Sequence, residues 1–240
     1  MSDSLNMLTK QRNQYLNQSI HNSNTSKERR ALNDTYTSSK TGVKLLSEKN
    51  EYDLPIFFQT GVDNPFQECP PSDSTQHYIP EFRFTNQDGK LMGRKEMEGK
   101  ITIVDFFFTS CPSICPVMSK EMERVNDHFR DEPLVQIMSI SIDPTYDTPQ
   151  ILKAYAEKHH AIPGKWHFLS GSKEETFQLA RCGFVLPAMD GNGIPDDFVH
   201  SDKFILIDDQ GRIRGYYSGT TREQVDLLML ETKILLYGKD

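Results

Sequence analysis

The eight residues from Ile101 to Phe108 constrain the fold of this chain more than any other stretch. They read ITIVDFFF, an almost continuous apolar run rich in β-branched and aromatic residues. Such a run predicts a strand with both faces buried, which is typical of sheets covered by helices on each side. Cys111 and Cys115 follow directly, at the carboxyl end of this strand. Ligands bind at that end in open α/β sheets, so a functional site is expected there.

The remaining periodicity predicts alternating strands and helices around this strand. A hairpin is expected at 79–92, further strands at 134–142, 166–170, 203–208 and 213–218, and helices ending near 130, at 149–158, at 173–181 and from 221 onward. Parallel βαβ units therefore come first, and a hairpin and a closing helix follow. This order is the thioredoxin pattern, an α/β fold with a mixed sheet flanked by helices.

Composition divides the chain into three parts. Residues 1–50 are rich in Ser, Asn, Gln, Thr and Lys, so they are expected to form a polar arm, disordered or ordered on a partner. Residues 51–78 contain four prolines and are expected to be an irregular segment packing on the core. Residues 79–240 hold all the predicted elements and are long enough to bury a core of their own.

Charge and hydropathy narrow the classes of partner. The formal charge is −7, and residues 1–50 carry eight Lys or Arg against four Asp or Glu, which leaves 19 against 30 for the rest. The net negative charge of residues 51–240 does not favour binding to nucleic acid. No window reaches the apolar length of about 18 residues that a transmembrane helix needs, and the amino terminus lacks the apolar core of a secretion signal. The sequence predicts either a cytosolic protein or a chain without its targeting segment.

Cys111 and Cys115 are separated by three residues within the run FTSCPSICP. If residues Pro112 to Cys115 form the first turn of the following helix, this i, i+4 spacing places both side chains on one helix face, roughly 5 to 6 Å apart at Cβ. A helix amino terminus stabilises thiolates, which both metal binding and disulfide exchange require. Two uses of the pair stay open at this point: a clamp for a soft metal ion, or a disulfide switch.

His200 separates these two uses. It comes just before the strand expected at 203–208, which should lie beside the strand of the thiols, at the level where thioredoxins place a cis-proline. No proline occupies residues 199–202. One imidazole and two thiolates form a three-ligand set suited to Cu(I) or Cu(II), with a position left for transfer. A dithiol oxidoreductase does not need the histidine and does need the proline.

Three ordered motifs resemble the Sco/SenC family of copper-binding thioredoxin-like proteins. They are FTSCPSICP at 108–116, SIDPTYDTP at 141–149, and His200-Ser201 followed by a strand and Gly211. The likeness runs from about residue 79 to the carboxyl terminus. It implies that Cys111, Cys115 and His200 bind copper, and that the protein is a metallochaperone that delivers copper to, or prepares, the binuclear copper centre of cytochrome c oxidase.

The resemblance also implies a partner and a location. The partner is the copper-bearing subunit of the oxidase or another copper chaperone, and the location is periplasmic or facing a membrane. The family is anchored by an amino-terminal helix, so membrane association is expected only through a segment not seen in this sequence. Two positions depart from the family: Ser113 replaces a common acidic residue between the cysteines, and Val199 replaces an Asp before the histidine. A less anionic metal site is expected.

The expected mechanism is ligand exchange, in which the thiolates of an acceptor replace Cys111 and Cys115 one at a time. Oxidation of the pair to a disulfide would block copper loading, so redox state gates function. The polar, Gly-containing loop 190–198 is expected to move and bring His200 to the metal. The alternative is an enzyme, a thiol-disulfide reductase with Cys111 as nucleophile and Cys115 resolving. A weaker third hypothesis is a thiol peroxidase that uses Thr109 and Cys111.

Other acidic and sulfur-containing residues are interpreted as structural. Asp143 and Asp147 are expected to be turn and cap residues between a strand and a helix. Cys182 is interpreted as a buried small hydrophobe, and Cys69, in its irregular segment, as a free or structural thiol.

Two groups at helical positions complete the candidates. Met118 and Met122 invite a copper interpretation, but a core stripe is the ordinary use of Met at helical spacing. His159 and His160 end a helix and are interpreted as compensating its dipole rather than as a pair of ligands.

Overall fold

The computed structural model describes residues 77–186 and 201–237, together with positions 7, 8, 10–12, 14, 45–49, 54–59 and 69. The chain divides into two units. One is Tyr78–Met229, and the other joins Met1–His77 with Leu230–Asp240. The candidate thiols lie in the first of these.

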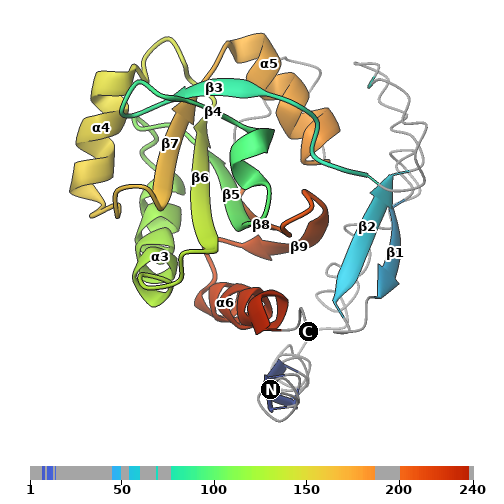
Figure 1. The fold of residues 1–240 in the computed structure, drawn as a ribbon. Coiled ribbons are helices and arrows are strands. Elements are labelled where there is room, and N and C mark those ends of the chain that lie inside the picture. The colour runs from blue at the N-terminus through green and yellow to red at the C-terminus, as the bar shows by residue number, and fades with distance from the viewer. Residues whose placement is uncertain are drawn as a thin grey trace. The chain divides into compact units, whose positions relative to one another are not determined.

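A seven-stranded mixed sheet forms the centre of the Tyr78–Met229 unit (Figure 1). In spatial order its strands are β4 (Leu91–Gly93), β3 (Arg83–Asn86), β7 (Trp166–Ser170), β6 (Val135–Ser141), β5 (Ile101–Phe107), β8 (Lys203–Ile207) and β9 (Ile213–Ser218). β5 pairs with β6 and β6 with β7 in parallel, and the other pairs are antiparallel. Every residue of β5 and β6 is buried, as expected for central strands covered on both faces. The predicted thioredoxin-like architecture is confirmed.

Two helices connect the parallel strands. α3 (Cys115–His128) follows β5, and α4 (Pro149–Lys158) follows β6. Both crossovers advance the sheet in the same direction, so right-handed connections place the two helices on the same face. A hydrogen bond of 2.8 Å between Ser119 Oγ on α3 and Tyr155 Oη on α4 joins them.

The helices predicted from residues 149 and 173 begin at those residues, and the side chain just before each start caps the helix. Thr148 Oγ1 accepts a hydrogen bond from Ile151 N–H, and Pro149 lies in the first turn of α4. Ser172 caps α5 (Lys173–Gln178) in the same way. α5 ends earlier than expected, because the chain continues as a π-helical turn over Leu179–Gly183. A 3₁₀ turn, η1 (Arg94–Met97), follows β4, and the helix α6 (Arg222–Tyr237) follows β9.

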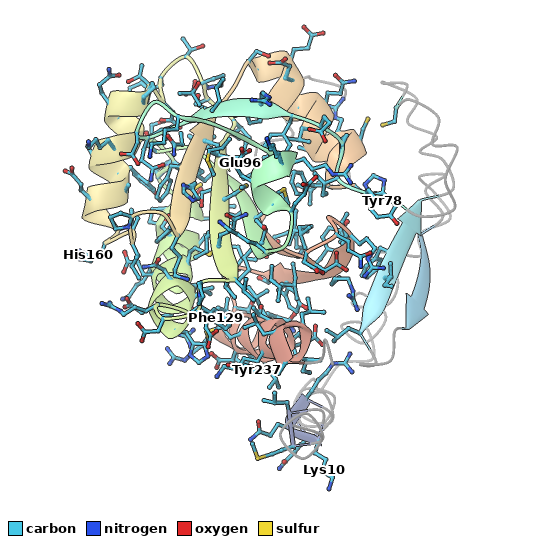
Figure 2. The ribbon with its side chains drawn as sticks, viewed as in Figure 1. Lys10, Tyr78, Glu96, Phe129, His160 and Tyr237 are labelled. Atoms are coloured by element: carbon cyan, nitrogen blue, oxygen red, sulfur yellow. The ribbon has the colours of Figure 1, made fainter. Side chains whose placement is uncertain are left out.

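The core contains the methionines that the sequence left between two interpretations. Met118 and Met122 on α3 are 1% and 0% exposed, so the predicted core stripe is confirmed. Phe129 follows at the end of α3, where Figure 2 labels it, and is also buried. Aromatic rings pack across the sheet face, with Phe107 of β5 in edge contact with Phe168 of β7 at 5.4 Å.

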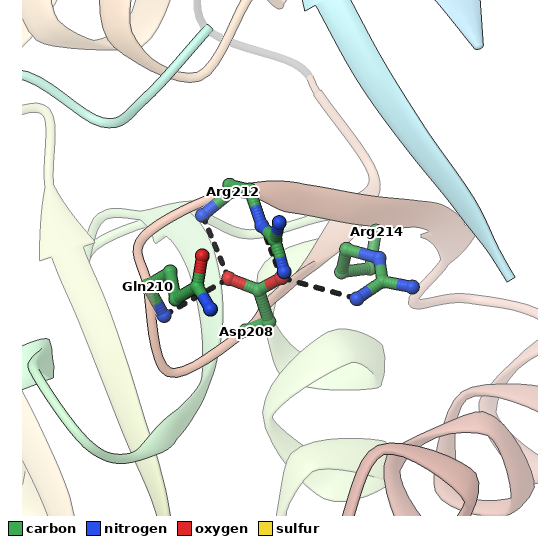
Figure 3. Close-up of polar contacts among 4 residues, drawn as sticks. All are labelled: Asp208, Gln210, Arg212 and Arg214. Carbon is green, nitrogen blue, oxygen red and sulfur yellow. Dashed lines mark hydrogen bonds and ion pairs between the residues drawn. The ribbon is translucent and has the colours of Figure 1, made fainter. Parts of the chain in front are cut away.

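A buried carboxylate fixes the turn between β8 and β9 (Figure 3). Asp208 accepts hydrogen bonds from the backbone N–H groups of Gln210 and Arg212. It also pairs with Arg212 Nε at 2.8 Å and with one terminal guanidinium nitrogen of Arg214 at 3.0 Å. Gly211 has a φ of 81°, which a residue without Cβ adopts freely. These contacts therefore fix the turn by which β9 folds back on β8.

The other unit contains a two-stranded antiparallel sheet that the sequence did not predict. β1 (Leu45–Lys49) pairs with β2 (Pro55–Gln59). Prolines in residues 51–78 suggested an irregular segment, but Pro55 is the first residue of β2, a position where its missing N–H costs little. In the same unit, Arg12 forms an ion pair with Glu231. The boundaries expected at residues 50 and 78 stay predictions.

Candidate metal centre

Cys111 and Cys115 lie where β5 passes into α3. Their exposed fractions are 6% and 3%, and both are free thiols. Cys111 closes a turn, since its N–H donates to Phe108 O at 3.2 Å. The helix begins only at Cys115, with Ile114 as its N-cap and Pro116 in the first turn. Cys111 therefore precedes the helix, and its place beside Cys115 depends on the turn rather than on helical spacing alone.

The two thiols have opposite acid–base character. Burial raises the pKa of Cys111, but hydrogen bonds from the backbone of Cys115 and Ser113, and from their side chains, stabilise the thiolate more, so its pKa falls to about 7. The Ser113 hydroxyl lies 3.6 Å from the Cys111 sulfur. Burial raises the pKa of Cys115 to about 12, and the neighbouring Cys111 adds to this rise. At neutral pH the pair therefore offers one thiol that is about half ionised to the nucleophilic thiolate and one thiol that keeps its proton.

A buried carboxyl group lies on β5 beneath the thiols. Asp105 is 3% exposed and accepts a hydrogen bond of 2.5 Å from Ser139 Oγ on β6. Ser139 Oγ in turn accepts from the indole nitrogen of Trp166 on β7 at 2.9 Å. Burial raises the pKa of Asp105 to about 7, against the lowering effect of the Ser139 bond.

Asp105 was not among the predicted site residues. Its charge contributes to raising the pKa of Cys115, so it belongs to the electrostatics of the site. The available signal was an aspartate in the middle of an otherwise apolar strand.

The loop between β6 and α4 borders the thiols, and its two aspartates differ in role. Asp143 is a turn residue as predicted: its carboxylate and its carbonyl both accept from Tyr146 N–H. The interpretation of Asp147 as a cap is wrong, because Thr148 caps α4. Asp147 is 0% exposed and accepts instead from the N–H and the hydroxyl of Thr109, in the turn before Cys111.

The predicted third ligand, His200, lies outside the described residues, as do Val199 and the whole of 187–200. β8 begins at Lys203 and runs antiparallel to β5. The amino end of β8 therefore lies at the same edge of the sheet as the carboxyl end of β5, as the sequence predicted. Among the residues that the structure describes, no three His, Cys, Asp or Glu side chains are grouped to hold a metal ion.

The order of these features, a buried strand, a Cys-x3-Cys turn and a following helix, matches a known family. A family model described as SCO1/SenC matches residues 70–233. This chain belongs to the SCO1/SenC family. The resemblance inferred from three motifs is thereby confirmed, and it covers the predicted domain from residue 79 almost to its end.

Solved SCO1/SenC proteins share the fold. A SCO1/SenC family lipoprotein from Bacillus anthracis is 32% identical, with a TM-score of 0.58 over 67% of this chain and 95% of that one. BsSco, described as having a disulfide switch and as a member of the Sco family of cytochrome c oxidase assembly proteins, is 29% identical, with a TM-score of 0.59 over 70% and 98%. ScoI from Arabidopsis thaliana, crystallised with copper bound, is 28% identical, with a TM-score of 0.53 over 66% and 98%.

The other cysteines of this SCO1/SenC chain differ from their predicted roles. Cys182, expected to be a buried small hydrophobe, is half-buried and disulfide-bonded. Cys69 is also disulfide-bonded. Disulfide formation depends on the approach of distant backbone segments, which the spacing of cysteines along the chain does not reveal. Only Cys111 and Cys115 remain as thiols.

The two histidines at the end of α4 also separate. His159 is buried, its Nδ1 lies 2.7 Å from Glu123 Oε1 on α3, and its ring lies 4.4 Å from that of Tyr155. It therefore joins two helices rather than compensating an exposed helix end. His160, labelled in Figure 2 at the outer end of α4, is exposed. No helix in the described part of the chain is long and apolar enough to cross a membrane.

Proposed function

We propose that this protein binds one copper ion through Cys111, Cys115 and His200 and delivers it to the copper-bearing subunit of cytochrome c oxidase. The observation that carries the proposal is the pair of buried, free thiols at the turn from β5 to α3 in a SCO1/SenC chain. Solved relatives include one with copper bound and one from a family of cytochrome c oxidase assembly proteins.

The donor atoms suit copper. Thiolate sulfur is a soft ligand that favours Cu(I), and imidazole extends the set to Cu(II). Cys111 is partly ionised at neutral pH, because its pKa is about 7, so it is the first sulfur available to the ion. Cys115 must lose a proton that burial helps it to keep, and copper binding displaces that proton. Loading is therefore expected to become tighter as pH rises.

Ser113 and Val199 make the site less anionic than the family pattern implies. Ser113 is exposed and contributes neutral hydrogen bonds to Cys111. When copper binding has displaced both thiol protons, two thiolates and one neutral imidazole carry a charge of −2, so the site with Cu(II) is neutral and the site with Cu(I) keeps one negative charge. Transfer then proceeds by exchange, with acceptor thiolates replacing Cys111 and Cys115 in turn.

A titration tests this proposal. Reduced protein is titrated with Cu(I) and with Cu(II) beside two variants, His200→Ala and the control His128→Gln, which changes an exposed histidine on α3. We expect one copper per chain, with a thiolate-to-metal absorption for Cu(II) that His200→Ala loses and His128→Gln keeps. Equal spectra for both variants would refute the role of His200, and the absence of a stoichiometric site would refute copper binding.

A second candidate function, reduction of a disulfide in the partner, has its own support. The low pKa of Cys111 beside the high pKa of Cys115 matches a nucleophile and a resolving thiol. In this reaction Cys111 attacks a disulfide of the partner, and one partner thiol leaves. Cys115 then attacks the mixed disulfide, which releases the second partner thiol and forms the Cys111–Cys115 disulfide. A Cys115→Ser variant should accumulate the mixed disulfide if this reaction occurs.

The peroxidase hypothesis receives no such support, because the Thr109 hydroxyl donates its hydrogen bond to Asp147.

We also propose that the protein works outside the cytoplasm, through its domain at residues 79–240. Disulfide-bonded Cys69 and Cys182 favour an oxidising compartment, and one relative is a lipoprotein. Cell fractionation, with alkylation of Cys69 and Cys182 before and after reduction, tests this location. Cytoplasmic protein with both thiols free would contradict it.

A further inference from the structure

Asp147 ends the β6–α4 loop, yet its carboxylate is bonded to the turn that carries Cys111. The N–H of Thr109, 38 residues earlier in the chain, donates to Oδ2 at 3.2 Å, and the Thr109 hydroxyl donates to Oδ1. The hydroxyl of Ser141, the last residue of β6, also donates to Oδ2. Three donors from two segments thus converge on one carboxylate that solvent does not reach.

The donors are all neutral, so Asp147 is not held there as half of an ion pair. Burying a carboxylate without a cation is costly unless hydrogen bonds compensate for the lost hydration. Bonds to an ionised acceptor are shorter and stronger than neutral ones, and three of them can compensate here. A group with this arrangement fixes the relative position of its donors firmly.

The local roles in this loop are filled by other residues. Thr148 caps α4, and Asp143 accepts from Tyr146 N–H within the turn. The Asp147 side chain serves neither purpose, and its longest-range bonds lead to Thr109. We therefore expect the Asp147 side chain to act on the turn before α3.

That turn determines where Cys111 lies. Cys111 N–H donates to Phe108 O, and Thr109 lies between these two residues. Cys115 is held independently by α3, of which it is the first residue. The separation of the two sulfurs therefore depends on the turn from Phe108 to Cys111, and Asp147 is what ties this turn to β6.

We propose that Asp147 is a positioning residue that, through Thr109, holds Cys111 beside Cys115. The proposal rests on the proposed function only in taking this thiol pair as the working site. Without the Asp147 hydrogen bonds the turn that carries Cys111 can move. The effective concentration of one thiol at the other then falls. Both disulfide formation and two-thiolate metal binding then become less favourable.

The test is an equilibrium that involves no copper. Full-length protein is equilibrated with glutathione buffers, quenched with acid and alkylated, and the peptide containing Cys111 and Cys115 is quantified by mass spectrometry. In this reaction one glutathione disulfide takes two electrons from the pair, the Cys111–Cys115 bond forms, and two glutathione thiols are released. The equilibrium constant measures the effective concentration directly.

Three substitutions distinguish positioning from charge and from stability. Asp147→Ala removes all three acceptor bonds, and we expect the constant to fall roughly tenfold. Asp147→Asn should remain close to the wild-type value, because its amide oxygen can accept from Thr109 N–H while its NH₂ donates to the rotatable Thr109 hydroxyl. The control Thr148→Ala loosens the same loop by removing the α4 cap and should leave the constant unchanged.

An unchanged constant in Asp147→Ala would overturn the proposal, as would an equal fall in Asp147→Asn, which would indicate a charge effect. If Asp147→Ala does not fold, Thr109→Val replaces it, since that change removes the hydroxyl donor alone. A fall in the equilibrium constant of Thr109→Val, smaller than the tenfold fall expected for Asp147→Ala, then supports the proposal, and an unchanged constant refutes it. Because copper is absent, these outcomes are independent of whether the copper titration succeeds.

Discussion

Replacing Asp105 by Asn should stabilise the Tyr78–Met229 unit, and more so as pH rises. The folded state keeps the Asp105 proton up to a pKa of about 7, whereas an aspartate exposed in the unfolded chain has a pKa of 3.8. Each pKa unit corresponds to about 1.4 kcal/mol. The wild-type protein therefore loses stability as pH rises from 3.8 to 7, by at most about 4 kcal/mol from this group. The amide of Asp105→Asn does not ionise and can still accept from Ser139 Oγ, so it avoids this loss.

Urea unfolding followed by tryptophan fluorescence is the suitable assay. Trp166 is the only tryptophan, is 1% exposed, and is linked to Asp105 through Ser139. We expect wild type and Asp105→Asn to be similar at pH 4 and to differ by about 2 to 4 kcal/mol at pH 8, the lower value allowing for relaxation around the charge.

The control Asp127→Asn removes an exposed carboxylate on α3 and should give no pH-dependent difference of this size. A difference between wild type and Asp105→Asn that is the same at pH 4 and pH 8 would refute the reasoning, because it would mean that Asp105 does not change protonation in this range.

Four further outcomes follow from the described contacts. In the reduced protein, the alkylation rate of Cys111 against pH should have its midpoint near 7, measured by site-resolved mass spectrometry; a midpoint above 8.5 would contradict the stabilised thiolate. Ser113→Asp should raise that midpoint, since a carboxylate replaces the hydroxyl that hydrogen-bonds to the Cys111 sulfur; a lower midpoint would be inconsistent with this. Asp208→Asn should cost about 3 kcal/mol in urea unfolding because it removes the buried carboxylate that pairs with Arg214, and a neutral effect would argue against a buried pair. Met122→Leu should change the free energy of unfolding by less than about 1.5 kcal/mol and leave one copper bound per chain; loss of copper binding would indicate that Met122 is a copper ligand.

Features set by neighbouring residues could be predicted from the sequence. The strand predicted at 101–108, the helix start at Pro149, and the hairpin around Gly211 each depend on residues within a few positions of one another. The placement of β8 beside β5 followed from the order of elements. The thiol pair was found because the two cysteines are separated by only three residues and follow a buried strand.

Features set by distant contacts could not. The partner of Asp147 lies 38 residues away, so its local sequence suggested only a cap. The disulfide-bonded state of Cys182 likewise depends on approach in space. Asp105 is a different case: its residue type was visible, but only the fully buried strand shows that its carboxyl group is desolvated. The helix begins at Cys115 rather than at Pro112. The position of Cys111 relative to Cys115 therefore depends on the turn before the helix and not on helical spacing.

Ser113 connects the departure from the family pattern to the chemistry of the pair. A carboxylate at this position would repel a thiolate and raise its pKa, whereas Ser113 hydrogen-bonds to Cys111 through both its backbone and its hydroxyl and lowers it. The neutral residue thus increases the difference in pKa between Cys111 and Cys115, which the proposed ligand exchange and disulfide exchange would both use. The same substitution removes a negative charge that would hold a cation. This chain is therefore expected to release copper more readily than a relative with an acidic residue there, and to keep a more reactive thiolate once the copper has left.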